Sequence, residues 1–252
     1  MSTQVVSHND WIAARQRFLK KEKEFTRMRD EISRERRELP RERVEKNYVF
    51  DGPNGKESLA DLFDDRSQLI VYHFMLGPGW AEGCPSCSFL GDHFDGSIVH
   101  LNARDVSFVV VSRAPLAEID AFKKRMGWKF KWVSSYNSDF NFDYGVSFSK
   151  EEAAKGTVAY NYASQPFFSE EGPGASVFQK DDAGKIFHTY STYGRGLDIF
   201  LGAYNFLDIT PRGRHEEGLP HGMAWVRHHD RYERTTAAAT CCSAVEDERS
   251  SR

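Results

Sequence analysis

Hydrophobic positions change their spacing several times along the chain, and each change predicts a new element. Residues 10–45 are densely charged, but Trp11, Phe18, Phe25 and Ile32 recur at a helical spacing. This pattern predicts an appended amphipathic helix. Its apolar stripe has to be covered either by its own domain or by a second copy of the chain, and a homodimer through this helix is one of the two expectations.

Nearly continuous apolar runs in the middle of the chain predict a buried sheet. Residues 68–75 and 106–111 are rich in β-branched and aromatic residues, as in strands that are buried on both faces. Residues 85–101 and 115–126 place their apolar side chains on one side of a helix. The order strand, helix, strand, helix favours parallel strands joined by crossover helices, and it places a functional site at the carboxyl ends of the strands.

The rest of the chain predicts a hairpin, an insertion and a tail. Residues 175–180 and 186–191 flank a polar turn and predict an antiparallel hairpin. A helix from about residue 197 to 207 closes the core, and the aromatic, irregular stretch 136–172 indicates a long insertion. The predicted division is a helical extension at residues 1–47, one α/β domain at 48–212, and a polar tail at 213–252 that we expect to be flexible.

Composition excludes some function classes without naming one. The 252 residues include 34 basic and 37 acidic side chains of mixed order, which leave a net charge of -3. No single-sign surface for nucleic acid or anionic lipid is therefore expected. No run approaches eighteen apolar residues, and the first residues lack the apolar stretch of a secretory signal. We expect a cytoplasmic protein that has neither nucleic acid nor membrane as a partner.

Four cysteines occur as two close pairs, Cys84 with Cys87 and Cys241 with Cys242. They are too few and too clustered for a secreted disulfide framework. Thiol–disulfide exchange needs an attacking thiolate and a second thiol that resolves the mixed disulfide. At a helix start, free backbone N–H groups favour a thiolate at Cys84, while Cys87 one turn later is shielded. These two residues are the predicted catalytic pair, and no metal or organic cofactor is expected.

Three further residues are predicted to tune the thiolate or bind substrate. His73 lies near the end of the first buried strand, and Arg113 lies at the end of the second. His73 would tune the thiolate, and the cation of Arg113 would stabilise it. The ordinary alternatives are a hydrogen-bonded core histidine, and an arginine that is solvated or contacts a helix terminus. Trp80, in the loop before the cysteines, would either wall a substrate or anchor its loop.

The order of elements around Cys84-Pro85-Ser86-Cys87 resembles the thioredoxin-like superfamily over about residues 48–208. The resemblance implies an α/β, thioredoxin-like fold with a central mixed sheet flanked by helices, and thiols or disulfides of proteins or small molecules as partners. It also implies a cis-proline packed against the dithiol, for which Pro173 stands at the matching position. More closely, several phrases look like a family of predicted bacterial dithiol–disulfide oxidoreductases that carries a domain-of-unknown-function label: Val71–Met75, Gly83–Phe89, Ser112–Pro115, Arg125–Trp128 and Phe187–Tyr193.

Two alternatives stay open on the sequence. Peroxiredoxin-like thiol peroxidases share the fold and would use Cys84 as the peroxidatic thiol, although Ala81 stands where those enzymes usually have threonine. A C-x-x-C pair is also half of a zinc site, so a non-catalytic module with structural or zinc-holding cysteines is the third interpretation. Gly83 stands where thioredoxins have tryptophan, so we expect substrate recognition to differ from theirs.

Overall fold

A mixed β-sheet forms the centre of this computed structural model, which describes residues 4–167 and 169–233. Within this part of the chain the sheet has eight strands, in the spatial order β1-β10-β9-β4-β5-β6-β2-β3. The strands are β1 Glu42–Arg43, β2 Val49–Gly52, β3 Gly55–Ser58, β4 Gln68–His73, β5 Val106–Ser112, β6 Trp132–Ser134, β9 Gly174–Lys180 and β10 Ile186–Tyr193.

The middle of the sheet confirms the predicted thioredoxin-like arrangement. Strand β4 pairs in parallel with β5, and β5 pairs in parallel with β6. On its other side β4 pairs antiparallel with β9, which continues into β10 as a hairpin. β4 and β5 are strongly apolar because both faces of these central strands are covered. The carboxyl ends of β4 and β5 therefore meet at one edge, and the cysteine loop follows that edge.

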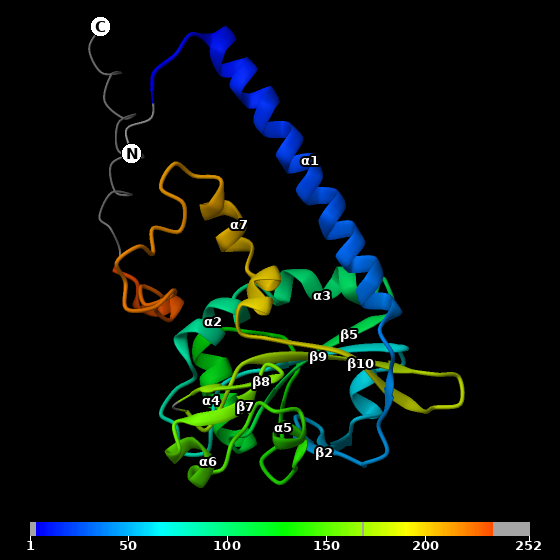
Figure 1. Cartoon of the computed structure of the whole chain (residues 1–252). Helices are drawn as coiled ribbons and strands as arrows, with labels where there is room; N and C mark the ends of the chain where they lie inside the picture. The colour runs from blue at the N-terminus through cyan, green and yellow to red at the C-terminus, as the bar shows by residue number, and fades with distance from the viewer. Residues whose placement is uncertain (1–3, 168, 234–252) are drawn as a thin grey trace, which may run out of the picture.

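Helices cover the sheet and extend from it (Figure 1). α1 runs away from the domain, whereas α2, α3 and α4 cover the sheet. In the described residues, no helix combines the length and the apolar character needed to cross a bilayer. The helices are α1 His8–Glu38, α2 Pro85–Gly91, α3 Asp95–Asn102, α4 Leu116–Met126, α5 Phe140–Asp143, α6 Lys150–Ala154 and α7 Gly202–Asp208, with 3-10 turns η1 Asp61–Phe63, η2 Gly194–Phe200 and η3 His229–Arg231.

The single helix that we predicted over residues 85–101 is divided into α2 and α3, which corrects the sequence analysis. The indole N–H of Trp128 donates to the carboxylate of Asp92 at 2.8 Å. The Asp95 carboxylate accepts the backbone N–H of Phe130 at 2.7 Å. These contacts come from the segment after α4, so they break the helix between Gly91 and Asp95 although its apolar periodicity continues.

The predicted insertion contains α5, α6 and a separate hairpin formed by β7 Thr157–Tyr160 and β8 Ala163–Pro166. Its aromatic residues Phe148 and Tyr160 form a small separate core together with Tyr193 of β10. Aromatic side chains bury large apolar areas, so a short irregular segment can be held by a few of them. The insertion packs beside the β9–β10 end of the sheet.

The prediction of a flexible tail over residues 213–252 is wrong for residues 213–233. Residues 213–233 fold back onto the domain, and the side chain of His228 is 1% exposed. An ion pair joins Arg125 to Asp230 at 2.9 Å, and another joins Arg231 to a glutamate of the cysteine loop. This segment is polar overall, but a few apolar residues and paired charges are enough to anchor it. Residues 234–252, with Cys241 and Cys242, lie outside the described residues.

Candidate dithiol site

The main chain around Cys84 is held on both sides. Its backbone N–H donates to the carbonyl oxygen of Met75, just after β4, at 3.0 Å. Its own carbonyl oxygen accepts the backbone N–H and the hydroxyl of Ser88, both at 2.9 Å. Cys84 precedes Pro85, the first residue of α2, so the helix begins immediately after the thiol.

Gly83 lets the loop approach the core closely. A Cβ atom at this position would lie 2.5 Å from a ring carbon of Phe74 and 2.7 Å from a ring carbon of Phe122. Neither ring can retreat easily, because both belong to the packed aromatic core beneath α2 and α4. The glycine that precedes Cys84 is therefore required by packing, and a tryptophan does not fit there.

The two thiols have different environments, and neither forms a disulfide. Cys84 is half-buried, and its pKa falls from 9.0 to about 6. The largest cause is a hydrogen bond from the Cys87 thiol, helped by the backbone N–H groups of Cys87 and Ser86 and opposed by burial. Cys87 is buried, and burial followed by the neighbouring Cys84 charge raises its pKa well above the usual value. Near neutral pH, Cys84 is therefore the thiolate and Cys87 the thiol.

Tyr72 is a further polar group beside the dithiol. Its hydroxyl is buried. No polar atom of the described residues lies at the distance and angle of a formed hydrogen bond to it. The Cys87 thiol is its neighbour, and burial together with the charges of Cys87 and Cys84 raises the pKa of the phenol. Since Tyr72 stays a neutral donor, its O–H can be shared with Cys87 when that sulfur becomes charged.

A cavity of about 750 Å³ opens next to both thiols. It is bounded by the start of α2, the turn after β10, α7 and the C-terminal segment 213–233. The lining is mainly apolar. Of its charged residues, Arg214 pairs with Asp198 at 2.9 Å, and Glu216 accepts hydrogen bonds from Tyr204 and Trp225. The apolar and small lining residues are Met75, Leu90, Phe167, Pro173, Leu197, Leu201, Gly222 and Met223.

Pro173 lines this cavity with the two cysteines, but it is not a cis-proline. No cis peptide bond occurs in the described chain, so the isomer implied by the resemblance is corrected. β9 begins at Gly174, immediately after Pro173. A Cβ atom at Gly174 would lie 2.8 Å from the ring of Tyr193 and 2.9 Å from Val146, so glycine allows this close approach of the strand. Tyr160 donates to the carbonyl oxygen of Pro173 at 2.5 Å.

Arg113 and Trp80 do not line the cavity. The guanidinium of Arg113 binds the buried carboxylate of Glu171 at 2.7 Å and lies 4.8 Å from the ring centre of Phe142. Its charge is therefore engaged away from the Cys84 thiolate. Trp80 packs against its own loop, where its ring would collide with a Cβ atom at Gly77. The structure supports the anchoring alternative for Trp80.

His73 lies on the opposite face of the sheet from Tyr72, because successive strand residues alternate. Its Nε2 atom is 2.9 Å from the hydroxyl oxygen of Ser176, which is 2.8 Å from that of Ser191. Burial lowers the pKa of His73 to about 3, so the ring is neutral near pH 7. It supplies no positive charge to the thiolate, and its role is that of a hydrogen-bonded core histidine.

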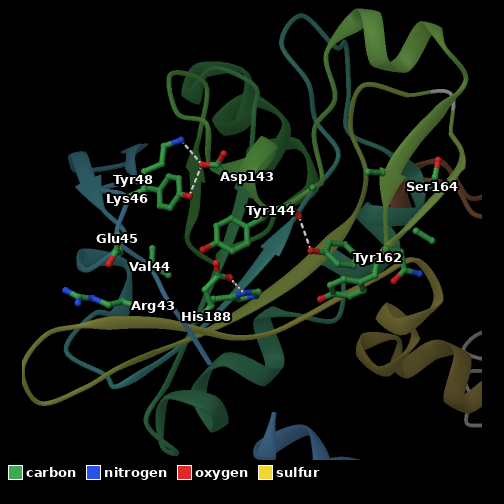
Figure 2. A pocket seen from close by; sticks show the side chains of 16 residues that line it. Arg43, Val44, Glu45, Lys46, Tyr48, Asp143, Tyr144, Tyr162, Ser164 and His188 are labelled. Atoms are coloured by element: carbon green, nitrogen blue, oxygen red, sulfur yellow. Dashed lines mark hydrogen bonds and ion pairs between the residues drawn. The ribbon is translucent and has the colours of Figure 1, made fainter. Parts of the chain in front are cut away.

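A second cavity of about 770 Å³ lies between the insertion and the strand that follows α1 (Figure 2). Figure 2 shows the ring of Tyr144 beside His188, and Asp143 joined to Lys46. It shares no lining residue with the cavity at the thiols among the residues described. The two cavities have similar volumes, so size does not distinguish them, and Cys84 and Cys87 line the one beside α2.

Tyr72 and His228 are the site residues that sequence reasoning missed. Strand alternation places Tyr72 and His73 on opposite faces of β4, but it does not tell which face adjoins the cysteines. For His228 no local signal exists. Its ring contacts the carbonyl oxygen of Gly83, 145 positions away, at 2.8 Å.

A zinc site needs further ligands beside the two cysteines. Within residues 4–167 and 169–233, no group of three or more His, Cys, Asp or Glu side chains is placed to hold a metal ion.

Comparisons with known proteins give a family and several distant structural likenesses. The family described as "Bacterial protein of unknown function (DUF899)" matches residues 1–232. No curated protein matches the chain. A cysteine-to-serine mutant of peroxiredoxin Q from Xanthomonas campestris is 13% identical, with a TM-score of 0.46 over 67% of this chain and 98% of that one. A putative thiol:disulfide interchange protein DsbE from Chlorobium tepidum is 14% identical, with a TM-score of 0.39 over 66% of this chain and 97% of that one.

Proposed function

Because this chain belongs to the DUF899 family of bacterial proteins of unknown function, we propose its activity from its own site: a dithiol–disulfide oxidoreductase that uses Cys84 and Cys87. The observation that carries this proposal is the difference between the two thiols. A half-buried thiolate opens into a cavity and a buried thiol adjoins it. Thiol–disulfide exchange needs one accessible thiolate that attacks the substrate disulfide and a second thiol that resolves the mixed disulfide.

The proposed reaction has two exchange steps. The Cys84 thiolate attacks one sulfur of a substrate disulfide, forms a mixed disulfide and releases the other substrate sulfur as a thiolate. Cys87 then loses its proton to that thiolate or to water, attacks the sulfur of Cys84, and releases the second substrate thiol. The substrate disulfide is reduced to two thiols while Cys84 and Cys87 are oxidised to a disulfide. An external dithiol returns the pair to its reduced form.

Tyr72 is proposed to assist the second step. Deprotonation of Cys87 is costly because the sulfur is buried. A hydrogen bond from the Tyr72 hydroxyl to the Cys87 sulfur would stabilise the thiolate as it forms, and this hydroxyl has no competing partner among the described residues. Tyr72 would thus position and stabilise the resolving thiolate without exchanging electrons.

Low-molecular-weight disulfides are the proposed substrates, rather than disulfides of folded proteins. Cys84 opens into a cavity with a wall formed by residues 213–233, instead of lying on a flat surface. A cavity of this volume suits a small organic molecule. In a reducing compartment such as the cytoplasm, the proposed location, the pair would be kept as a dithiol.

The thiol peroxidase alternative would use the same thiolate, with a peroxide as oxidant and Cys87 resolving the sulfenic acid. The surroundings favour disulfide exchange, because the nearby arginines already bind carboxylates. Arg113 is bound to Glu171, and both cavity arginines, Arg195 and Arg214, are bound to Asp198 rather than left for a peroxide beside Cys84. Consumption of hydrogen peroxide or cumene hydroperoxide, measured beside disulfide reduction, separates the two activities.

The direct test is a redox titration of the full chain. The protein is equilibrated in graded dithiothreitol buffers, alkylated differentially and examined by mass spectrometry. We expect one reversible two-electron transition that joins Cys84 to Cys87. Cys84→Ser should abolish it, whereas a matched control, Cys241→Ser with Cys242→Ser, should retain it. Absence of this disulfide in every buffer, or zinc bound in equal molar amount to the reduced protein, would overturn the proposal.

A further inference from the structure

The long helix α1 carries an exposed apolar stripe with a strict repeat. Trp11, Phe18, Phe25 and Ile32 follow one another at intervals of seven residues. Their side chains are between 48% and 66% exposed. A seven-residue repeat on a helix fits a left-handed pairing with another helix, because it keeps one face turned toward the partner.

The domain itself does not cover this stripe. α1 has no buried residue within the described chain, and Figure 1 shows it running away from the sheet. Its contact with the domain lies near its end, where the guanidinium of Arg36 lies 4.8 Å from the ring centre of Tyr190. The described domain of the same chain therefore leaves the stripe uncovered, and a separate partner can pack against it.

The charges that flank the stripe identify that partner. With the four apolar residues at heptad position a, position g of one helix approaches position e of the next heptad in a parallel partner. The same sequence on both helices then gives opposite charges in every such pair: Asp10 with Arg15, Arg17 with Glu22, Glu24 with Arg29, and Glu31 with Arg36. A second copy of α1 thus matches both the apolar repeat and the charge pattern.

The direction of pairing follows from the same charges. In an antiparallel pair, g positions face g positions, so Asp10 would meet Glu31 with like charge while Arg17 would meet Glu24 with opposite charge. Half of these pairs would repel, whereas every pair of the parallel arrangement attracts. At position d, Ala14 and Met28 are compatible with a seam, while Lys21 and Glu35 place charges there, which lowers stability. The pairing should therefore be reversible and depend on protein concentration.

We propose that α1 forms a parallel coiled coil with α1 of a second copy, so that the protein is a homodimer. The 31 residues of α1 give a rod roughly 46 Å long. Both dithiol domains would lie at the same end of this rod. The proposal rests on α1 alone and is independent of the activity proposed for Cys84.

Sedimentation equilibrium of the full chain over a range of concentrations tests the dimer. We expect a monomer–dimer equilibrium in the wild type and a monomer in the double variant Phe18→Glu with Phe25→Glu. Since both side chains are exposed, this variant should keep its domain folded, which circular dichroism and thermal unfolding will verify. A monomeric wild type at all concentrations overturns the proposal.

Charge reversal tests the charge pattern. In a symmetric dimer, position 24 of each helix faces Arg29 of the other. Glu24→Arg therefore replaces two attractive pairs by two arginine–arginine pairs, and should raise the dimer dissociation constant about tenfold. Adding Arg29→Glu should restore it. Arg27→Glu makes the same kind of change at position c, outside the seam, and should have little effect. If the Glu24→Arg variant and its restoring double variant dimerise equally well, the charge pattern does not select the partner.

Cross-linking tests the direction. In the parallel pair, Phe18 of one copy lies against Phe18 of the other, so Phe18→Cys should form an intermolecular disulfide between identical peptides under mild oxidation. Mass spectrometry identifies the linked peptide and separates it from products of the native cysteines. A dimer in which the introduced thiols never join each other would be antiparallel or lie elsewhere, and would overturn the parallel arrangement.

Discussion

His228 donates a hydrogen bond from Nε2 to the carbonyl oxygen of Gly83, at 2.8 Å. His228 belongs to the C-terminal segment, and Gly83 immediately precedes the thiolate residue Cys84. The carbonyl oxygen accepts, so the Nε2 atom carries the proton. A bond between such distant parts of the chain fixes the loop that presents Cys84.

Replacement of His228 should loosen the cysteine loop. His228→Ala leaves the buried carbonyl of Gly83 without its donor, which should lower the free energy of unfolding by about 1–3 kcal/mol. The rate of Cys84 alkylation at pH 7 should fall as well. His229→Ala is the control, because His229 is exposed and binds Asp92 at the surface. Urea unfolding and timed alkylation measure both effects, and equal behaviour of the two variants would contradict the role of the bond.

A methyl group at Gly83 should be poorly tolerated. Gly83→Ala places a Cβ atom within 2.7 Å of the rings of Phe74 and Phe122, and such overpacking costs about 1–3 kcal/mol of stability. Gly96→Ala in α3 is the matched control, since its Cβ atom would meet nothing within 4 Å. That variant should be equally stable or more stable. Thermal unfolding of both proteins checks the prediction, which fails if Gly83→Ala unfolds at the wild-type temperature.

The reactivity of Cys84 should depend on pH with a midpoint near 6. Because its pKa is lowered to about 6, the reactive thiolate dominates at pH 7 and is lost as the pH falls through 6. Iodoacetamide rates from pH 4 to 9 should therefore plateau above neutrality. Cys87→Ala removes the largest stabilising hydrogen bond and should move the midpoint upward. A wild-type midpoint near the ordinary value of a thiol would show that the site does not activate Cys84.

Loss of the Tyr72 hydroxyl should slow resolution without unfolding the protein. Tyr72→Phe removes a buried hydroxyl that has no hydrogen-bond partner by geometry within the described chain, so stability should change little. Resolution of a mixed disulfide at Cys84 should become several-fold slower, with its pH dependence shifted upward, because the Cys87 thiolate loses a donor. Release of a chromogenic thiol gives the rate. Tyr162→Phe is the control, because Tyr162 lines the other cavity, and it should leave this rate unchanged. If Tyr72→Phe does not alter the rate or its pH dependence, the Tyr72 hydroxyl has no role in resolution.

Arg113 should matter for stability and not for the thiolate. Arg113→Ala leaves the buried carboxylate of Glu171 without its cation, which should cost about 3–5 kcal/mol of stability. Adding Glu171→Gln should recover part of this loss, since the unpaired charge is removed. The alkylation midpoint of Cys84 should stay near pH 6 in both variants. An upward shift of that midpoint would show that Arg113 does stabilise the Cys84 thiolate.

Local patterns predicted the elements that depend on neighbouring residues. The apolar run before His73, the helix ended by Gly127 and the β9–β10 hairpin all lie where the sequence places them, since the left-handed conformation of Gly127 and the alternation of strands are local properties. The break between α2 and α3 was not predictable in this way, because it depends on Trp128 and on the backbone after it.

Chain periodicity and the C-x-x-C spacing were sufficient to place Cys84 at a helix start after a buried strand, since both are short-range features of the chain. They do not show which face of β4 adjoins the cysteines, so they point to His73, whereas Tyr72 is the residue beside the thiols. Nor could they show that residues 213–233 wall the cavity. Those contacts join segments far apart in the chain, and no local propensity encodes which distant carbonyl, ring or carboxylate a side chain will meet.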